Sequence, residues 1–293
     1  MSTIKAYWTQ VWLLIRKVDV FFNASAITFN LFICAIPFSL ILISIIGYIL
    51  SFETAYTELT RYGTELLPDL AYENSNQIFI ESERIVQGLI LPLVEGRNVL
   101  GITGIIVMLF FTQGLFHSLK MVLYDVFDIQ EQNHPLMNII YNFLGIGLLG
   151  SVFLFFSLLI SVVSLFDLRT ISIPYTQVVI QLPWIYELLD VLLPLIFTFL
   201  LAFVVFRFMS DRQITIKYSL LGASLFTFLF ESAKLLLSFY LNYALSSYES
   251  VYQSYTVIIV LAFWVFYLSI LFVFSAILVK AKILSGKISL TLN

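Results

Sequence analysis

Six polar residues follow one another at intervals of three or four along an otherwise apolar stretch near the C-terminal end of the chain. They are Ser224, Thr227, Glu231, Lys234, Ser238 and Asn242, called the polar stripe below. This spacing places all six on one face of a helix, with Glu231 and Lys234 close enough to pair. One charge at the centre of a bilayer costs about 2.5–3.5 kcal/mol on insertion scales, so an accidental pair there is disfavoured.

Two interpretations of the polar stripe stay open at the level of sequence. In the first, the stripe lines a polar cavity or a path for a substrate. In the second, its ion pair and hydrogen bonds hold neighbouring helices together. A stripe that faces lipid is disfavoured by the cost of the two charges.

Other polar residues are candidates for the same path. Asn23, Asn30, Pro37 and Ser44 are seven residues apart and share one slowly drifting face, from which the amides could contact the polar stripe. Gln113 and His117 share a second face with Lys120 and Tyr124. The candidate path therefore comprises the polar stripe together with Asn23, Asn30, Gln113 and His117, while a hydrogen-bonded interfacial role for His117 is the simpler alternative.

The elements that carry these residues are expected to be membrane-spanning helices. Hydrophobic residues make up 60% of the 293 and charged residues only 11%, against about 25% charged in a typical soluble domain. Windows of about 20 residues, enough to cross about 30 Å of hydrocarbon, predict six spans. These lie at 27–50, 99–119, 136–166, 188–207, 216–241 and 254–279. The fold class is therefore all-α, an integral membrane bundle in a single domain over residues 1–293.

Between and before the spans, two amphipathic helices are expected. Residues 1–26 carry apolar residues, two of them Trp, at helical spacing, which is typical of a helix on the inner membrane surface. The long outer loop, 51–98, has a similar pattern from Phe79 to Leu93, which indicates a helix on the outer surface or a lid over the bundle. In the third span Gly147, Gly150, Ser157, Ser161 and Ser164 form a small-residue seam, best explained by close helix packing.

The distribution of Lys and Arg predicts the orientation. Ten lie in the N-terminal segment, the second and fourth loops and the tail at 280–293, four lie on the other side, and Lys234 lies inside a span. Because cytoplasmic loops carry the excess of basic residues, both termini are expected in the cytoplasm.

Several kinds of chemistry find no support in the residues. Cys34 is the only cysteine, and His117 and His134 are the only histidines, so neither a disulfide framework nor a metal site is expected. No phosphate-binding loop or G-x-S-x-G signature occurs, which argues against ATP hydrolysis and serine hydrolysis. With a net charge of -3, the chain is not expected to bind nucleic acid. We expect no cofactor, no metal and no catalytic residue.

Four stretches give the chain a resemblance to a known family over nearly its whole length. They are residues 24–29 (ASAITF) with 36–38 (IPF), residues 114–119 (GLFHSL) with 122–126 (VLYDV), the region from 206–207 (FR) through 222–223 (GA) to 230–234 (FESAK) and 240–241 (YL), and residues 251–254 (VYQS). The sequence resembles the YihY/BrkB family of bacterial inner-membrane proteins, historically labelled as ribonuclease BN. Gln253 stands where the family usually has Gly. The ribonuclease label is not supported by the residues above.

The resemblance implies a multi-pass protein of the bacterial inner membrane with a virulence and serum-resistance association. Together with the polar stripe, it favours a transporter or a protein that handles a lipid or other amphiphile, with membrane lipids and a small amphiphilic substrate as partners. The alternative is a non-transporting scaffold or envelope-maintenance protein that recruits factors through residues 51–98. An enzyme is the minority hypothesis.

Overall fold

The computed structural model describes residues 2–52, 75–129, 135–165, 170–172, 179–181, 183–210, 214–252 and 256–291. Side chains are described at 4–52, 91–129, 140, 143–161, 187–210, 214–240 and 257–286. His134 and Gln253 lie outside the described residues, as does the part of the long outer loop at 53–74. The side chains of Asn242 and Ser164 lie outside the described set as well.

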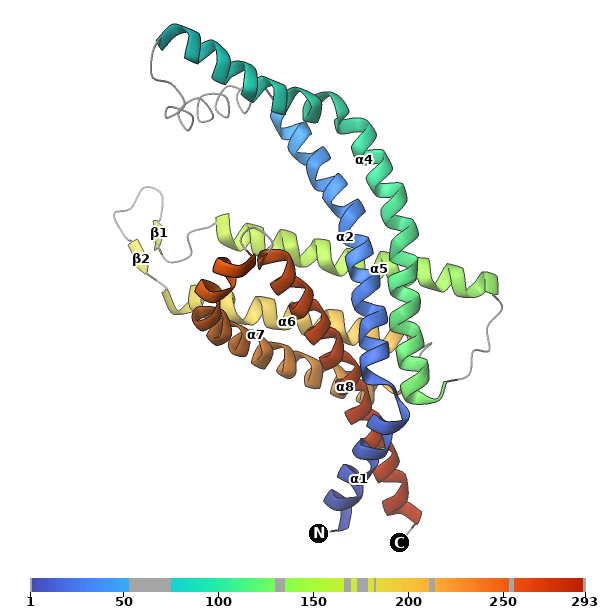
Figure 1. Ribbon diagram of the computed structural model, residues 1–293. Coiled ribbons are helices and arrows are strands. Elements are labelled where there is room, and N and C mark those ends of the chain that lie inside the picture. The colour runs from blue at the N-terminus through green and yellow to red at the C-terminus, as the bar shows by residue number, and fades with distance from the viewer. Residues whose placement is uncertain are drawn as a thin grey trace. The chain divides into compact units, whose positions relative to one another are not determined.

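Helices dominate the described chain (Figure 1). They are α1 (Ser2–Lys17), α2 (Val20–Leu50), α4 (Ser75–Phe127), α5 (Pro135–Leu165), α6 (Pro183–Phe208), α7 (Ile216–Tyr252) and α8 (Thr256–Thr291). All of these except α1 contain a stretch long and apolar enough to cross a membrane. The predicted all-α class and the six spans are confirmed.

A small antiparallel pair joins α5 to α6. Strands β1 (Thr170–Ser172) and β2 (Val179–Gln181) pair with Ile171 opposite Ile180. This pair was not predicted from the sequence, because three residues are too few to show an alternating pattern.

Helix α4 runs through the predicted boundary between the outer loop and the second span. Residues 75–98 were assigned to the loop, but α4 begins at Ser75 and continues without a break to Phe127. Pro92 lies inside it and removes one backbone hydrogen bond without ending the helix. The predicted helix of the loop and the second span are therefore one element.

The chain divides into two compact units, of which one comprises Asn30–Thr112. In this unit α2 and α4 approach each other closely at glycines. A Cβ placed on Gly47 would lie 2.3 Å from the Leu93 carbonyl oxygen, and one on Gly104 would lie 2.8 Å from Ile41 Cγ1. The buried Ser44 hydroxyl donates a 2.6 Å hydrogen bond to the Arg97 carbonyl. Small residues here let the two backbones meet, as is usual in membrane helix pairs.

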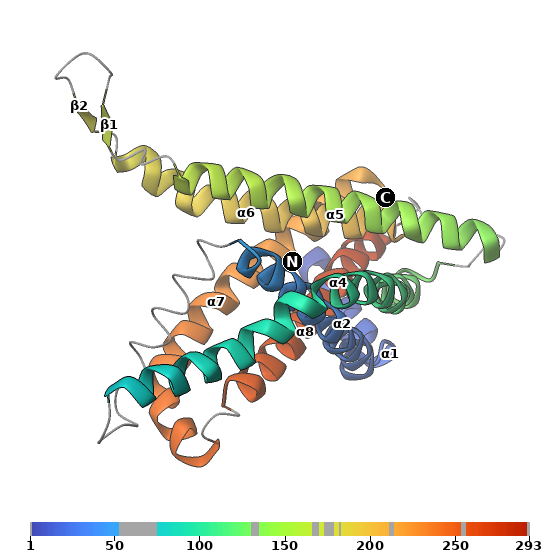
Figure 2. The same cartoon turned by 90° about the horizontal axis from the view of Figure 1, so that it is seen from above.

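The second unit comprises Met1–Phe29 and Gln113–Asn293. Helix α6 packs between α5 and α7, and α7 packs in turn on α8; Figure 2 shows α5 and α6 side by side. Helix α1 packs along α8, where Tyr7 donates a 3.4 Å hydrogen bond to the Leu278 carbonyl. Its Val11 and Leu14 are buried, whereas Trp8 is 59% exposed. The predicted amphipathic N-terminal helix is confirmed, with one apolar face on the protein and Trp8 on an exposed face.

The predicted small-residue seam of the third span is wrong at its glycines. No described atom lies within 4 Å of a Cβ placed on Gly147 or Gly150, so no helix approaches closely there. Gly145 instead makes the close contact, with its Cβ position 3.2 Å from the Phe116 ring. The seam residues therefore form a small-residue face on α5. Apolar neighbours such as Phe155, which is 61% exposed, flank this face.

Candidate functional site

The ion pair predicted in the polar stripe is present. Lys234 Nζ lies 2.7 Å from Glu231 Oε2 on α7, and Lys234 Nζ also lies over the Phe230 ring at 5.5 Å from its centroid. Glu231 lies roughly 22 Å along α7 from Ile216, at about 1.5 Å per residue, which is well inside a span of about 30 Å. The side chains of Lys234 and Glu231 are 42% and 31% exposed.

The contacts of the pair stay within one helix. Both the carboxylate of Glu231 and the ring of Phe230 belong to α7, and among the described residues no other helix supplies a partner to Lys234. A pair that closes within α7 does not link two helices. This geometry weakens the interpretation of the pair as a tie between helices and leaves an exposed dipole at membrane depth.

Three residues of the candidate path each carry a buried polar atom that has no hydrogen bond to the described residues. Glu231 Oε1 and Thr227 Oγ1 on α7 are buried and have no hydrogen-bond partner in the described part of the chain, and the same holds for Gln113 Nε2 on α4. A buried polar atom left unpaired costs about 1–3 kcal/mol, and such sites in native proteins commonly hold water or a ligand group.

The burial of the stripe changes along α7. Thr227 is 5% exposed, Glu231 is half-buried, and Ser238 is exposed. Ser224 is exposed and donates its hydroxyl to the Leu220 carbonyl of its own helix at 2.9 Å. The polar face is therefore enclosed at Thr227 and opens toward the C-terminal half of the span.

The secondary candidates lie on α2 and α4. Asn23 donates a 3.2 Å hydrogen bond to Asp125 Oδ2 at the end of α4. Asn30 and Gln113 are half-buried on α2 and α4, and His117 is exposed on α4. The part of these four residues in a path stays a prediction.

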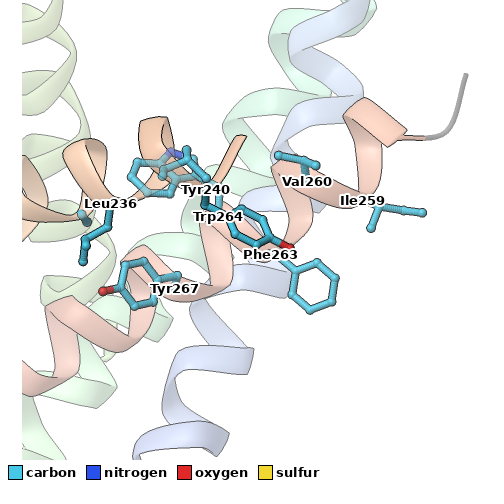
Figure 3. A pocket seen from close by; sticks show the side chains of 9 residues that line it. Leu236, Tyr240, Ile259, Val260, Phe263, Trp264 and Tyr267 are labelled. Carbon is cyan, nitrogen blue, oxygen red and sulfur yellow. The ribbon is translucent and has the colours of Figure 1, made fainter. Parts of the chain in front are cut away.

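An apolar groove lies between α7 and α8, beside the polar stripe (Figure 3). Its volume is about 240 Å³, and it is lined by Ala233, Leu236, Leu237, Tyr240, Ile259, Val260, Phe263, Trp264 and Tyr267. The Trp264 ring contacts Phe230 at 6.3 Å between centroids, so Phe230 stands between the groove and the Lys234 ammonium. This groove was not predicted, since aromatic residues at helical spacing in an apolar span look the same as packing residues.

A cluster of charged residues joins α1, α4 and α8. It lies at the end of the spans where both termini are found. Asp128 pairs with Lys17 of α1 and lies 2.9 Å from Lys280 Nζ of α8, and Lys280 also donates a 2.7 Å hydrogen bond to the Phe127 carbonyl. The hydrogen bond from Lys17, followed by that from Lys280, lowers the pKa of Asp128 below its ordinary value. The same bond to Asp128 raises the pKa of Lys17.

The backbone at Asp128 explains why this residue occupies the junction. Its φ of 55° is left-handed, and the Ile129 N–H donates to the Tyr124 carbonyl at 3.0 Å, which closes the C-terminus of α4. Asp tolerates this conformation better than most residues. In the sequence, this junction is signalled by an Asp just past an apolar span. Lys17 and Lys280 were counted only in the prediction of the membrane orientation.

The described residues provide no ligands for a metal. No group of three or more His, Cys, Asp or Glu among them could hold a metal ion.

Comparison with known protein families matches residues 11–282 to the virulence factor BrkB family. The chain belongs to that family. With its six apolar helices, this BrkB family member is a multi-pass membrane protein. No curated protein and no solved structure matches the chain.

One of the four stretches that carry the BrkB resemblance, the one that runs from Phe206 through Gly222 and Ala223, has a clear packing role. A Cβ on Gly222 would lie 3.0 Å from two atoms of the Phe206 ring, and neighbouring Ala223 is fully buried. Phe206 is itself fully buried and contacts Phe272 of α8 at 5.4 Å between centroids. The Gly-Ala pair thus brings α7 onto α6 and fixes the helix that carries Glu231.

Proposed function

We propose that the protein handles a lipid or another amphiphile in the bacterial inner membrane and moves its polar group along the polar stripe of α7. The observation that carries the proposal is the Glu231–Lys234 pair, which lies at membrane depth, is partly exposed and bonds within its own helix. Two exposed charges in hydrocarbon are unfavourable by several kcal/mol unless a polar group or water meets them. A passing headgroup would meet that need.

The buried part of the stripe supports a path for a substrate rather than a polar surface that faces lipid without a function. Thr227 Oγ1 and Glu231 Oε1 are buried and lack partners among the described residues, so the stripe has acceptors to offer a group that donates hydrogen bonds. The apolar groove beside it supports an amphiphile over a simple ion, because an ion needs no apolar surface.

The location and orientation form part of the same proposal. Helix α1 lies along the C-terminal half of α8, so the two ends of the chain lie at the same end of their unit. The excess of Lys and Arg at that end supports a cytoplasmic position for both termini. The scaffold alternative depends on residues 51–98, of which 53–74 lie outside the described part, and no described contact favours it.

Reconstitution into phospholipid vesicles tests the proposed function. Fluorescent phospholipid in the inner leaflet becomes accessible to a membrane-impermeant reductant only if the protein moves it. We expect movement with the natural chain and its loss in the double variant E231Q/K234Q. The matched control is K217Q, which neutralises an exposed lysine near the start of the same helix. Unchanged movement in the double variant would refute the role of the stripe.

A further inference from the structure

We propose that the groove between α7 and α8 binds one acyl chain of a membrane glycerophospholipid whose phosphate lies at Lys234. The inference rests on the proposed function and names the part of the substrate that each surface takes. The groove is formed by two consecutive helices of one unit, and its lining is apolar and aromatic (Figure 3).

The size of the groove fits a chain segment and excludes a whole lipid. An apolar cavity of about 150 Å³ in another protein holds benzene, so about 240 Å³ accommodates several methylene groups. The rest of an amphiphile must then lie outside. The groove allows this, because Leu236 and Phe263 at its margin are 62% and 71% exposed.

The position of the groove selects a hydrocarbon chain as its occupant. The lining residues lie between 233 and 240 on α7 and between 259 and 267 on α8, within the apolar stretches of both spans. At that depth the surrounding medium is lipid, whose chains are available at high concentration. The rings of Phe263 and Trp264 belong to the lining of the groove, and a hydrocarbon chain can lie against such apolar surface without the loss of polar contacts.

The polar end of the same ligand is expected at the edge of the groove nearest the ion pair. The Trp264 N–H and the Tyr267 hydroxyl have no hydrogen-bond partner given by the described residues and can donate to ester oxygens. Beyond Trp264, Phe230 leads to the Lys234 ammonium, which has three N–H donors and pairs with one oxygen of Glu231. An ammonium of this kind is a common phosphate ligand.

Fluorescence of Trp264 provides a direct test in detergent micelles. The chain has four Trp residues, so W8F/W12F/W184F leaves Trp264 as the single emitter. The probes are a lysophosphatidylcholine with a dibrominated acyl chain, which quenches nearby Trp, and the dibrominated fatty acid methyl ester, which lacks phosphate. We expect saturable quenching by both probes and tighter binding of the phosphate-bearing one.

Two variants in the single-Trp background separate binding in the groove from general contact with micelles. V260F places a larger side chain in the groove and should weaken binding of the probes roughly tenfold. This is the expected effect because the larger ring would keep about two methylene groups of the acyl chain out of an apolar site. V257F makes the same change at a position that is 74% exposed and outside the groove, and should bind as before. K234Q should bring the two probes to equal affinity, with K217Q as its control.

Each outcome decides the proposal. Saturable quenching that V260F weakens and V257F preserves supports it, whereas linear quenching, or equal effects of the two variants, overturns it. A dimer that shields Trp264 from the probes and dissociates in V260F would also overturn it, since the groove would then hold a second copy of the chain. If acyl chains bind in the groove but lipid movement is unchanged in E231Q/K234Q, the proposed function alone is refuted. If lipid movement is lost in E231Q/K234Q but acyl chains do not bind in the groove, the groove proposal alone is refuted.

Discussion

Replacement of Gly47 by alanine tests the close approach of α2 and α4, where a Cβ has less room than at any other described glycine. The new Cβ would lie 2.3 Å from the Leu93 carbonyl oxygen and 3.0 Å from Arg97 Cβ, whereas ordinary contacts are 3.4–4 Å. Relief of more than 1 Å of overlap against backbone requires α2 and α4 to separate locally. Such overpacking costs about 1–3 kcal/mol. The shift would also stretch the hydrogen bond from Ser44 to the Arg97 carbonyl. Side-chain hydrogen bonds between membrane helices contribute about 0.6 kcal/mol each on average.

The assay is reversible unfolding of the purified protein in mixed micelles by increasing SDS. We expect G47A to lose about 1–3 kcal/mol of unfolding free energy. The matched control is G147A, because no described atom lies within 4 Å of its Cβ position. Alanine is the better helix former by up to about 1 kcal/mol, so G147A should be neutral or slightly more stable. Equal stability of G47A and G147A would refute the close approach of α2 and α4.

Three further perturbations test other contacts. Because the pKa of Asp128 is lowered in the folded state, its contribution to stability is complete above its ordinary value of 3.8 and is lost as the pH falls through the folded value. Below that pH, the thermal stability of the natural chain should therefore fall by more than that of D128N. Parallel pH curves for the two proteins would contradict the pairing with Lys280. S44A should lose about 0.5–1.5 kcal/mol in SDS unfolding, and no loss would contradict the buried hydrogen bond. G222A should lose about 1–3 kcal/mol in the same assay, because its Cβ meets the Phe206 ring, and a neutral result would contradict that packing.

Sequence reasoning predicted the spans because hydropathy over about 20 residues is a strong local signal. It did not predict that the outer-loop helix and the second span form one continuous helix, because charged residues between 81 and 97 lower the local hydropathy without interrupting α4. The Glu231–Lys234 pair was predictable for a similar reason, since residues three apart on a helix lie on one face.

Contacts between distant segments were less accessible to sequence reasoning. The seam at Gly147 and Gly150 has the composition of a packed surface, yet nothing described packs on it, while Gly47 and Gly222 make the close approaches. Composition reports which residues permit close packing, and only the path of the neighbouring helix decides where it occurs. The Asp128 junction has the same origin, because it joins elements more than 100 residues apart.

Reversal of the Glu231–Lys234 pair tests the central claim most directly. In vesicles, the movement of fluorescent phospholipid would be measured for the natural chain, E231Q/K234Q and the reversed pair E231K/K234E, each at matched amounts of folded protein. The reversed variant retains a neutral pair within α7 but exchanges the positions of acceptor and donor. We expect loss of lipid movement in both variants, with unfolding stability retained in the reversed one. Full movement in either variant would contradict it.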